Sequence, residues 1–352
     1  MLNIATLGIY SAWAKVRTKQ YFYRNTVLDG THFDYDANPI QILKGRSLVL
    51  SVLILIYGLS LLDPLYSAVL SGSLSLLMPL FIQRSLKFNT HYSSYRNLRF
   101  RFTGSLKAVF GIGFLLPLLF GISAAGLIAI AQRLEAYGSV QLIGLVSFIT
   151  YAFFFIPYLF YRYKKFVVDH SWYGTSRFRF ATPFREFCLL TAEFYAWILF
   201  GALLLRFVFP NSATLLQELL QSSDPTAMSR EDWLQLAPIL TFALIFPLFI
   251  YVLFIVRTHN MVFNHASLEG VELRANFTLW SYTRLCVSNG LILLLSCGLC
   301  WPLVRVRSAR YKALHTFVVV HATLNHFIAR DTAQANAVGD AVGDYLDIDF
   351  VF

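Results

Sequence analysis

The stretch LFIQRSLKFNTHYSSYRNLRFRFTGSLKAVFG, residues 80–111, decides how this chain folds. It starts at the end of an apolar run, turns basic, and enters a new apolar run after Thr103. An apolar helix that ends among basic residues and is followed by another apolar helix is typical of a chain that returns to a membrane. The alternation around Phe100–Phe102 indicates a short extended piece between the two helices.

The whole chain has the composition of a membrane protein. Of its 352 residues 57% are apolar and 14% are charged, whereas soluble domains carry about 25% charged residues. Most of its apolar runs are near or above the roughly 18–20 residues that cross a bilayer. These runs are 48–62, 65–82, 106–131, 140–161, 188–209, 234–256 and 285–304. Because backbone polar groups in lipid need internal partners, we expect helices and an all-α polytopic membrane protein.

The basic residues are concentrated in five hydrophilic segments, which hold 26 of the 29 Lys and Arg but only six of the 19 acids. The segments are 15–46, 84–107, 162–185, 257–284 and 304–330. The positive-inside rule predicts that they lie in the cytoplasm. We therefore expect one membrane domain over residues 1–352, built of helical hairpins that these segments join, with an acidic C-terminal tail at 331–352.

The five basic segments resemble one another, which predicts a modular chain with internal pseudo-repeats. Each copy has an arginine just after its apolar run, at positions 17, 84, 162, 257 and 307. The first four copies continue into short alternating pieces at 33–35, 100–102, 178–180 and 273–275. The expected unit is a helix entering the cytoplasmic face, a basic extension, a short extended or hairpin piece, and a helix leaving.

The fourth and fifth basic segments are separated by a single apolar stretch, residues 285–304. One crossing would place the fifth basic segment outside the cell, against the positive-inside rule. Small and polar residues at 288–290 and 296–298 would allow two half-helices. We expect a broken or re-entrant element here, since non-helical backbone at membrane depth is tolerated only where protein or water surrounds it.

Three stretches, TLGIYSAWAKVR (6–17), YFYRNTVLDGTHFDY (21–35) and ILKGR (42–46), resemble the YjgN-like family of bacterial inner-membrane proteins, a domain of unknown function. The resemblance covers essentially the whole chain, including GDYLDIDF at 343–350. It implies a multi-pass protein of the inner membrane and no particular reaction. Family members carry a lead-in before the first stretch, so we expect residues 2–14 to be the second half of an element equivalent to 285–304.

The second basic segment is the candidate site for anionic lipid headgroups, because residues 84–107 contain no acid. Each juxtamembrane base adds about 1 kcal/mol to such binding. The alternative is that these charges only set the topology. The candidate residues are Arg84, Lys87, Arg96, Arg99 and Arg101.

One position is polar in four of the five copies, where it holds Asn25, His170, His265 and His315. If the repeats surround a common axis, these side chains would form a polar ring that binds a metal or titrates near neutral pH. The alternative is that each caps its own helix. Glu193 is a further candidate, since a carboxylate inside an apolar run is costly and often functional.

No catalytic dyad, phosphate loop or metal-ligand spacing is visible, so we expect no enzyme and no cofactor. The interrupted helices and the repeats favour a transporter- or channel-like protein for an anionic or amphiphilic small molecule. The alternative is a lipid-binding or scaffold membrane protein without transport. Membrane lipids are the expected partners, and nucleic acid is not, because no recognition module accompanies the basic charge.

Overall fold

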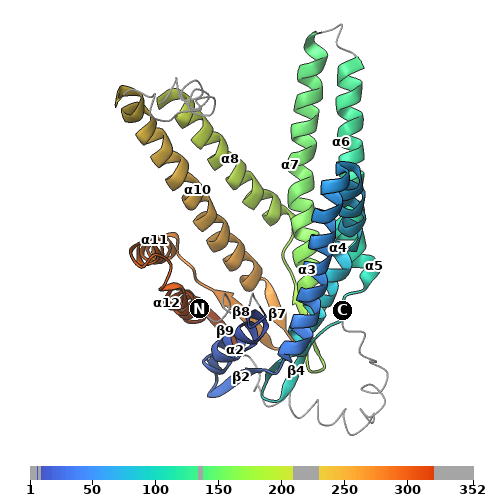
Figure 1. Ribbon diagram of the computed structural model, residues 1–352. Coiled ribbons are helices and arrows are strands. Elements are labelled where there is room, and N and C mark those ends of the chain that lie inside the picture. The colour runs from blue at the N-terminus through green and yellow to red at the C-terminus, as the bar shows by residue number, and fades with distance from the viewer. Residues whose placement is uncertain (1–5, 7–8, 134–137, 209–229, 321–352) are drawn as a thin grey trace.

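The computed structural model describes residues 6, 9–133, 138–208 and 230–320 (Figure 1). Its long helices converge on a small sheet and splay apart away from it. Within the described residues, five helices are long and apolar enough to cross a membrane. These spans are Pro39–Leu62, Leu65–His91, Leu106–Gly126, Phe184–Val208 and Leu236–Asn264. The expected polytopic membrane protein is therefore supported by length and composition.

The structure contains the following helices, most of which form pairs that leave the sheet and return to it. They are α2 (Ser11–Arg24), α3 (Pro39–Leu62), α4 (Pro64–His91), α5 (Leu106–Phe110), α6 (Leu116–Arg133), α7 (Gly138–Asp169), α8 (Phe184–Val208), α10 (Arg230–Asn264), α11 (Leu279–Leu295) and α12 (Trp301–Leu314). A π-helical turn, Gly111–Leu115, connects α5 to α6. The pairs α3–α4, α6–α7 and α8–α10 are the long arms of Figure 1.

Local sequence explains where two of these helices begin. The Asn38 side chain accepts a hydrogen bond from the Ile40 N–H at 3.0 Å, and Asp63 accepts one from the Leu65 N–H at 2.8 Å. A proline follows each cap, where its fixed φ suits the first helical turn and its missing N–H costs nothing. A capping residue followed by proline is a helix-start signal, and α3 and α4 begin at Pro39 and Pro64.

The all-α prediction was wrong, because the helices stand on a nine-stranded antiparallel sheet whose strand order follows the chain. The strands are β1 (Val27–Leu28), β2 (Thr31–Tyr35), β3 (Ser93–Tyr95), β4 (Leu98–Phe102), β5 (Ser171–Tyr173), β6 (Ser176–Phe180), β7 (Ala266–Leu268), β8 (Val271–Ala275) and β9 (Thr316–Val320). The four predicted extended pieces lie in β2, β4, β6 and β8. The prediction treated each piece as local, whereas half of the pairings join strands on either side of a helical pair.

Two kinds of connection build this sheet. Tight turns join β1 to β2, β3 to β4, β5 to β6 and β7 to β8, and positive φ angles at Asp29 (46°) and Gly30 (70°) make the first of them. Such values match the turns that suit the twist of a β-hairpin. Helical pairs make the other connections, and there the register repeats: Tyr35 faces Ser93, and Phe102 faces Ser171. Each pair of helices thus returns the chain to the next place along the sheet.

The stretch 285–304 is broken, as predicted. Helix α11 ends at Leu295, a turn with positive φ at Cys297 and Gly298 follows, and α12 begins at Trp301. The chain returns to the sheet, since β9 pairs with β8. The second predicted break, at 288–290, is absent because these residues lie inside α11. Whether this helix pair enters the membrane stays a prediction.

Some predictions fall on residues outside the described ranges. These are the acidic tail 331–352, residues 321–330 of the fifth basic segment, and most of the N-terminal residues 2–8.

Candidate functional site

The strands have two chemically opposite faces because side chains alternate along a strand. In β4 and β6 the same tetrapeptide, Arg-Phe-Arg-Phe, occurs. Phe102 and Phe180 are buried on the inner face. Arg99, Arg101 and their counterparts Arg177 and Arg179 are exposed on the outer face. The curled sheet is therefore apolar inside and basic outside.

The hairpin ends of the sheet meet in an apolar tip cluster, formed by Tyr95, Tyr173, Leu268 and Val271. Two tyrosine hydroxyls link one hairpin to the previous one. Tyr95 donates to the backbone oxygen of Leu28 at 2.7 Å, and Tyr173 donates to that of Tyr95 at 3.0 Å. The tip cluster thus closes the inner face at the end away from the helices.

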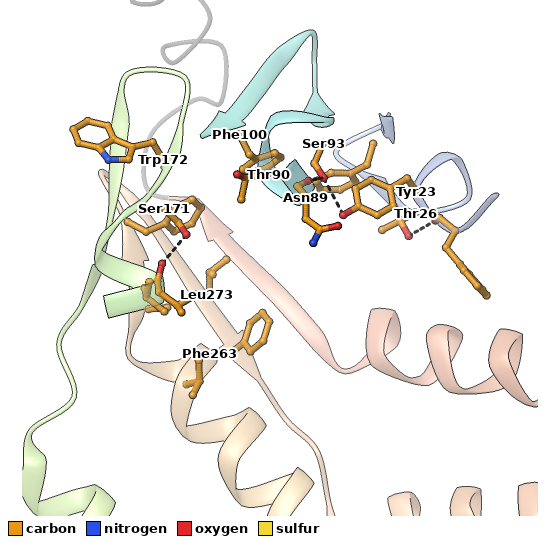
Figure 2. Close-up of a pocket in the computed structure, with 17 residues that line it drawn as sticks. Tyr23, Thr26, Asn89, Thr90, Ser93, Phe100, Ser171, Trp172, Phe263 and Leu273 are labelled. Carbon is orange, nitrogen blue, oxygen red and sulfur yellow. Dashed lines mark hydrogen bonds between the residues drawn. The ribbon is translucent and has the colours of Figure 1, made fainter. Parts of the chain in front are cut away.

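A cavity of about 580 Å³, which we call the cup, lies between the strands and the last turns of α2, α4, α7 and α10 (Figure 2). The middle residues of four strands line it, at corresponding places: Phe33, Phe100, Phe178 and Leu273. Residues from the helix ends complete the lining, including Phe22, Asn89, Val167, Val262 and Phe263. Four helix–hairpin units thus contribute to one open hollow.

Most polar groups of the cup lie on the side formed by α2 and α4. The Ser93 hydroxyl donates to the Tyr23 oxygen at 3.1 Å, and the Thr26 hydroxyl donates to the Phe22 carbonyl at 2.8 Å (Figure 2). Asp, Glu, Lys, Arg and His are absent from the described lining. Since these two hydroxyls already have partners, the cup offers its contents mainly hydrocarbon surface.

One positively charged side chain, Lys19, contacts Asn89 on the α2–α4 side of the cup. The Lys19 ammonium donates to the Asn89 side-chain oxygen, and to the Tyr35 hydroxyl at 3.3 Å. Burial, with a smaller effect from Lys15, lowers the pKa of Lys19. Burial also raises the pKa of Tyr35 to about 12. Both shifts have the sign that desolvation imposes, because burial disfavours the charged form of either group.

The four residues of the predicted polar ring each end a helix and bind their own helix. The ring Nδ1 atoms of His170, His265 and His315 lie 2.9 Å from the carbonyls of Phe166, Met261 and Tyr311. Asn25 donates to the Tyr21 carbonyl at 2.7 Å. None of the four lines the cup, and the described residues contain no group of three His, Cys, Asp or Glu that could hold a metal. The geometry is that of the capping alternative.

In several units the residue that follows the helix also makes a backbone hydrogen bond to a strand end, which gives the position a structural role. The carbonyl of His170 accepts from the Thr103 N–H at 2.9 Å, and that of His265 accepts from the Ala181 N–H at 3.0 Å. His315 and Tyr92 accept in the same way from Asn276 and Asp36. Each helix end is thereby joined to the end of the neighbouring strand.

The five basic residues predicted to bind an anion occupy three different places. Arg96 lies in the β3–β4 turn and pairs with Asp29 at 2.5 Å. Arg99 and Arg101 project from the outer face of β4. Arg84 and Lys87 belong to α4 instead. These residues are close together in the sequence, but the chain changes from helix α4 to the β3–β4 hairpin between them, so they lie on different elements.

Glu193 on α8 is paired with Arg257 on α10, with 3.0 Å between its Oε1 and the arginine Nη2. The bond from Nε of the same guanidinium measures 3.2 Å. The predicted intramembrane carboxylate therefore joins two spanning helices near the sheet.

Sequence reasoning missed the cup and the grouping of Trp172, Arg177 and Arg179 on the outer face of the sheet. Two signals could have found them. Asp29-Gly30 is a dipeptide expected at a tight hairpin turn, and Gly270 supplies the positive φ of another. The repeated Arg-Phe-Arg-Phe pattern predicts strands with one apolar and one basic face.

Comparison with known proteins gives a consistent picture. Residues 1–345 match a family described as bacterial protein of unknown function (DUF898). The chain is 24% identical to inner membrane protein YjgN of Escherichia coli O157:H7 over 345 residues, which cover 91% of this chain and 83% of the relative. It is 31% identical to the Salmonella typhimurium protein of that name over 126 residues, or 34% and 30% of the two chains. No solved structure matches the chain significantly.

Proposed function

The chain belongs to the DUF898 family of bacterial proteins of unknown function, and on that premise we propose that it binds the hydrocarbon part of an amphiphile in the cup. Relatives named as inner membrane proteins and the apolar helices support an inner-membrane location. The proposal concerns what such a protein holds at the level where its helices meet the sheet.

The observation that carries this proposal is the chemistry of the cup. Its volume, about 580 Å³, is within the range of about 300–1,000 Å³ typical of small-molecule sites. Phenylalanine, valine and leucine side chains from four units form most of its lining. An inorganic ion or a charged metabolite would lose its hydration there without finding a counter-charge on the lining, at a large cost. A hydrocarbon chain would gain from leaving water.

We further propose that the sheet end of the molecule is cytoplasmic and that its helix–hairpin units are internal repeats. The basic segments support the first point, since Lys and Arg are enriched on the cytoplasmic side of membrane proteins. The repeated register and the repeated helix-end hydrogen bonds support the second. The cup would then face the inner leaflet of the membrane, from which an amphiphile could enter.

Transport of the bound amphiphile is a second candidate function. A second apolar cavity of about 540 Å³ lies between the spanning helices and is lined by Ile112, Phe160, Leu190 and Phe254 among others. Prolines 79, 157 and 247 lie inside three of the helices. A proline removes a hydrogen bond from the helix interior, and helices weakened or broken beside a binding site are a feature of transporters. A scaffold role without any ligand is the remaining alternative.

Photo-crosslinking tests the proposed binding. The full chain is reconstituted with a phospholipid that carries a diazirine in its acyl chain, illuminated, and digested for mass spectrometry. We expect labelled peptides from the ends of α7 and α10 and from β8. Val262→Trp, which fills the cup, should lower the labelling of those peptides, whereas Val49→Trp on the exposed side of α3 should not.

A second variant separates loss of the cup from loss of the fold. Leu273→Asn keeps the same number of side-chain heavy atoms and places an amide in the cup, so it should also lower the labelling. Size-exclusion profiles of the variants must match that of the native chain. Equal labelling in native, Val262→Trp and Leu273→Asn proteins would show that the cup does not hold the chain of the lipid.

Transport has its own readout. Proteoliposomes that contain fluorescent phospholipid are treated with a membrane-impermeant quencher, and exchange between leaflets is followed as loss of protected fluorescence. Faster exchange with the native chain than with Val262→Trp would support transport. Binding without exchange would favour the lipid-binding alternative.

A further inference from the structure

The outer face of the sheet carries a basic patch whose one residue in common with the cup lining is Trp172. In the register of strands β4 to β6, Arg101 faces Trp172, and Trp172 faces Arg177. The indole therefore lies between two arginines on adjacent strands. Arg179 follows two residues later on the same face of β6. The alternation that fills the cup with phenylalanine thus places these basic side chains on the opposite surface.

Beside this patch is a groove of about 480 Å³ at the junction of α7 with the sheet. Side chains of both charges line it: Lys165, Arg177, Arg179, Asp169 and Glu269, with Trp172 at one side. The three cations and two carboxylates come from α7, β6 and the β7–β8 turn. A groove lined by both positive and negative side chains is complementary to a ligand that carries both a negative and a positive group.

The contacts within the groove leave the cations available. Within the described part of the chain, the side chain of Arg179 forms no hydrogen bond or ion pair, and it is exposed. Arg177 donates through Nε to the Asp169 backbone oxygen, which leaves its terminal nitrogens for another acceptor. Lys165 donates to the Tyr161 hydroxyl at 3.1 Å. A planar guanidinium fits the oxygens of a phosphate well.

The two carboxylates are held in place by the protein. Asp169 accepts from the Phe180 N–H at 2.8 Å through Oδ1, and Glu269 accepts from the Ser176 hydroxyl at 3.2 Å through Oε2. A carboxylate accepts several hydrogen bonds at once, so both can still accept from an ammonium group.

The position of the groove indicates where its ligand comes from. Lys165 and Tyr161 belong to the last turns of α7, where that helix reaches the sheet. Trp172 donates from Nε1 to the Thr103 hydroxyl at 2.9 Å, which fixes the indole beside the groove. Tryptophan, tyrosine and basic residues together are typical of the membrane–water interface.

We propose that this groove binds the headgroup of a membrane phospholipid that carries a phosphate and a primary ammonium. The phosphate lies against Arg177, Arg179 and Lys165, and the ammonium lies against Asp169 and Glu269. A purely anionic headgroup would be repelled by the two carboxylates and would have no positive group to pair with them. A quaternary amine carries no N–H and could not donate hydrogen bonds to the carboxylates. The groove shares Trp172 with the cup lining, and its charged residues Lys165, Asp169, Arg177, Arg179 and Glu269 do not line the cup.

Native mass spectrometry of the full chain in mild detergent tests the site. The protein is titrated with phosphatidylethanolamine, phosphatidylglycerol and phosphatidylcholine that have identical acyl chains, so any contribution of the cup is common to all three. We expect the ethanolamine lipid to bind tightest. Arg179→Gln should weaken its binding about tenfold, since a charged hydrogen bond contributes about 1.5–3 kcal/mol. Arg274→Gln, on the outer face of β8 and paired with Glu272, should leave it unchanged.

Glu269→Gln provides a second test, because the amide keeps an acceptor for Ser176 but removes the charge. It should reduce the preference for the ethanolamine over the glycerol lipid. Unchanged binding in Arg179→Gln, or tighter binding of the glycerol lipid by the native chain, would overturn the proposal.

Discussion

Replacing Tyr173 with phenylalanine tests whether the hairpins are joined through the tip cluster. The Tyr173 side chain is 5% exposed, and its hydroxyl donates to the Tyr95 backbone oxygen at 3.0 Å. The variant keeps the ring and removes only the donor. The ring contacts with Phe100, 5.0 Å between centroids, should therefore remain.

The expected loss follows from the burial of the bond. A typical hydrogen bond contributes about 1 kcal/mol net, and leaving a buried carbonyl without a partner adds to that. We expect the free energy of unfolding to fall by about 1–2 kcal/mol, which raises the unfolded fraction about 5- to 30-fold. Tyr95→Phe should behave similarly, because its hydroxyl bonds the Leu28 oxygen at 2.7 Å.

The assay is equilibrium unfolding of the purified protein in mixed micelles, followed by circular dichroism. Tyr57→Phe is the matched control, since Tyr57 on α3 is 67% exposed. The two sites are in different parts of the molecule, and both variants remove a single hydroxyl. An unfolding free energy for Tyr173→Phe equal to that of Tyr57→Phe would refute the role assigned to the tyrosine bonds.

Two further predictions concern helix packing and pH. A Cβ at Gly201 on α8 would collide with the Phe246 ring on α10, so Gly201→Leu should destabilise the protein by about 1–3 kcal/mol. Gly58→Leu should not destabilise it, because a Cβ at Gly58 meets open space. Equal melting temperatures for the two variants would contradict this prediction. The hydrogen bond from Arg24 lowers the pKa of the Asp34 carboxyl in the folded protein. The pair therefore stabilises the fold at pH values above the unfolded pKa of about 3.9, and this stabilisation is lost as the pH falls through the folded pKa. The native chain should thus be more stable than Asp34→Asn at neutral pH, and the difference in unfolding midpoint should shrink at acidic pH; a difference that is independent of pH would contradict the pairing.

The sequence predicted what depends on neighbours along the chain. Helix starts at Asn38 and Asp63, extended pieces in four strands, and the break before Trp301 all follow from caps, alternation and small residues. The exact ends of helices depend on individual hydrogen bonds, as at α11, where the Thr278 side chain accepts from the Ser281 N–H.

What the sequence did not reveal depends on pairing between distant residues. Tyr35 faces Ser93 across the whole α3–α4 pair, and no local pattern specifies that two strands so far apart will meet. The cup was missed for the same reason, since Phe33, Phe100, Phe178 and Leu273 come together only when the sheet forms. His170 and His265 each bind a carbonyl of their own helix, and similarity between segments of the sequence does not distinguish a shared site from a recurring helix cap.

The most direct test of the account is a cryo-electron microscopy map of the full chain in lipid nanodiscs. If the cup binds hydrocarbon, the map should show elongated density in contact with Phe100, Phe178 and Leu273. A cup that is closed by its own side chains, with no such density, would contradict the central claim.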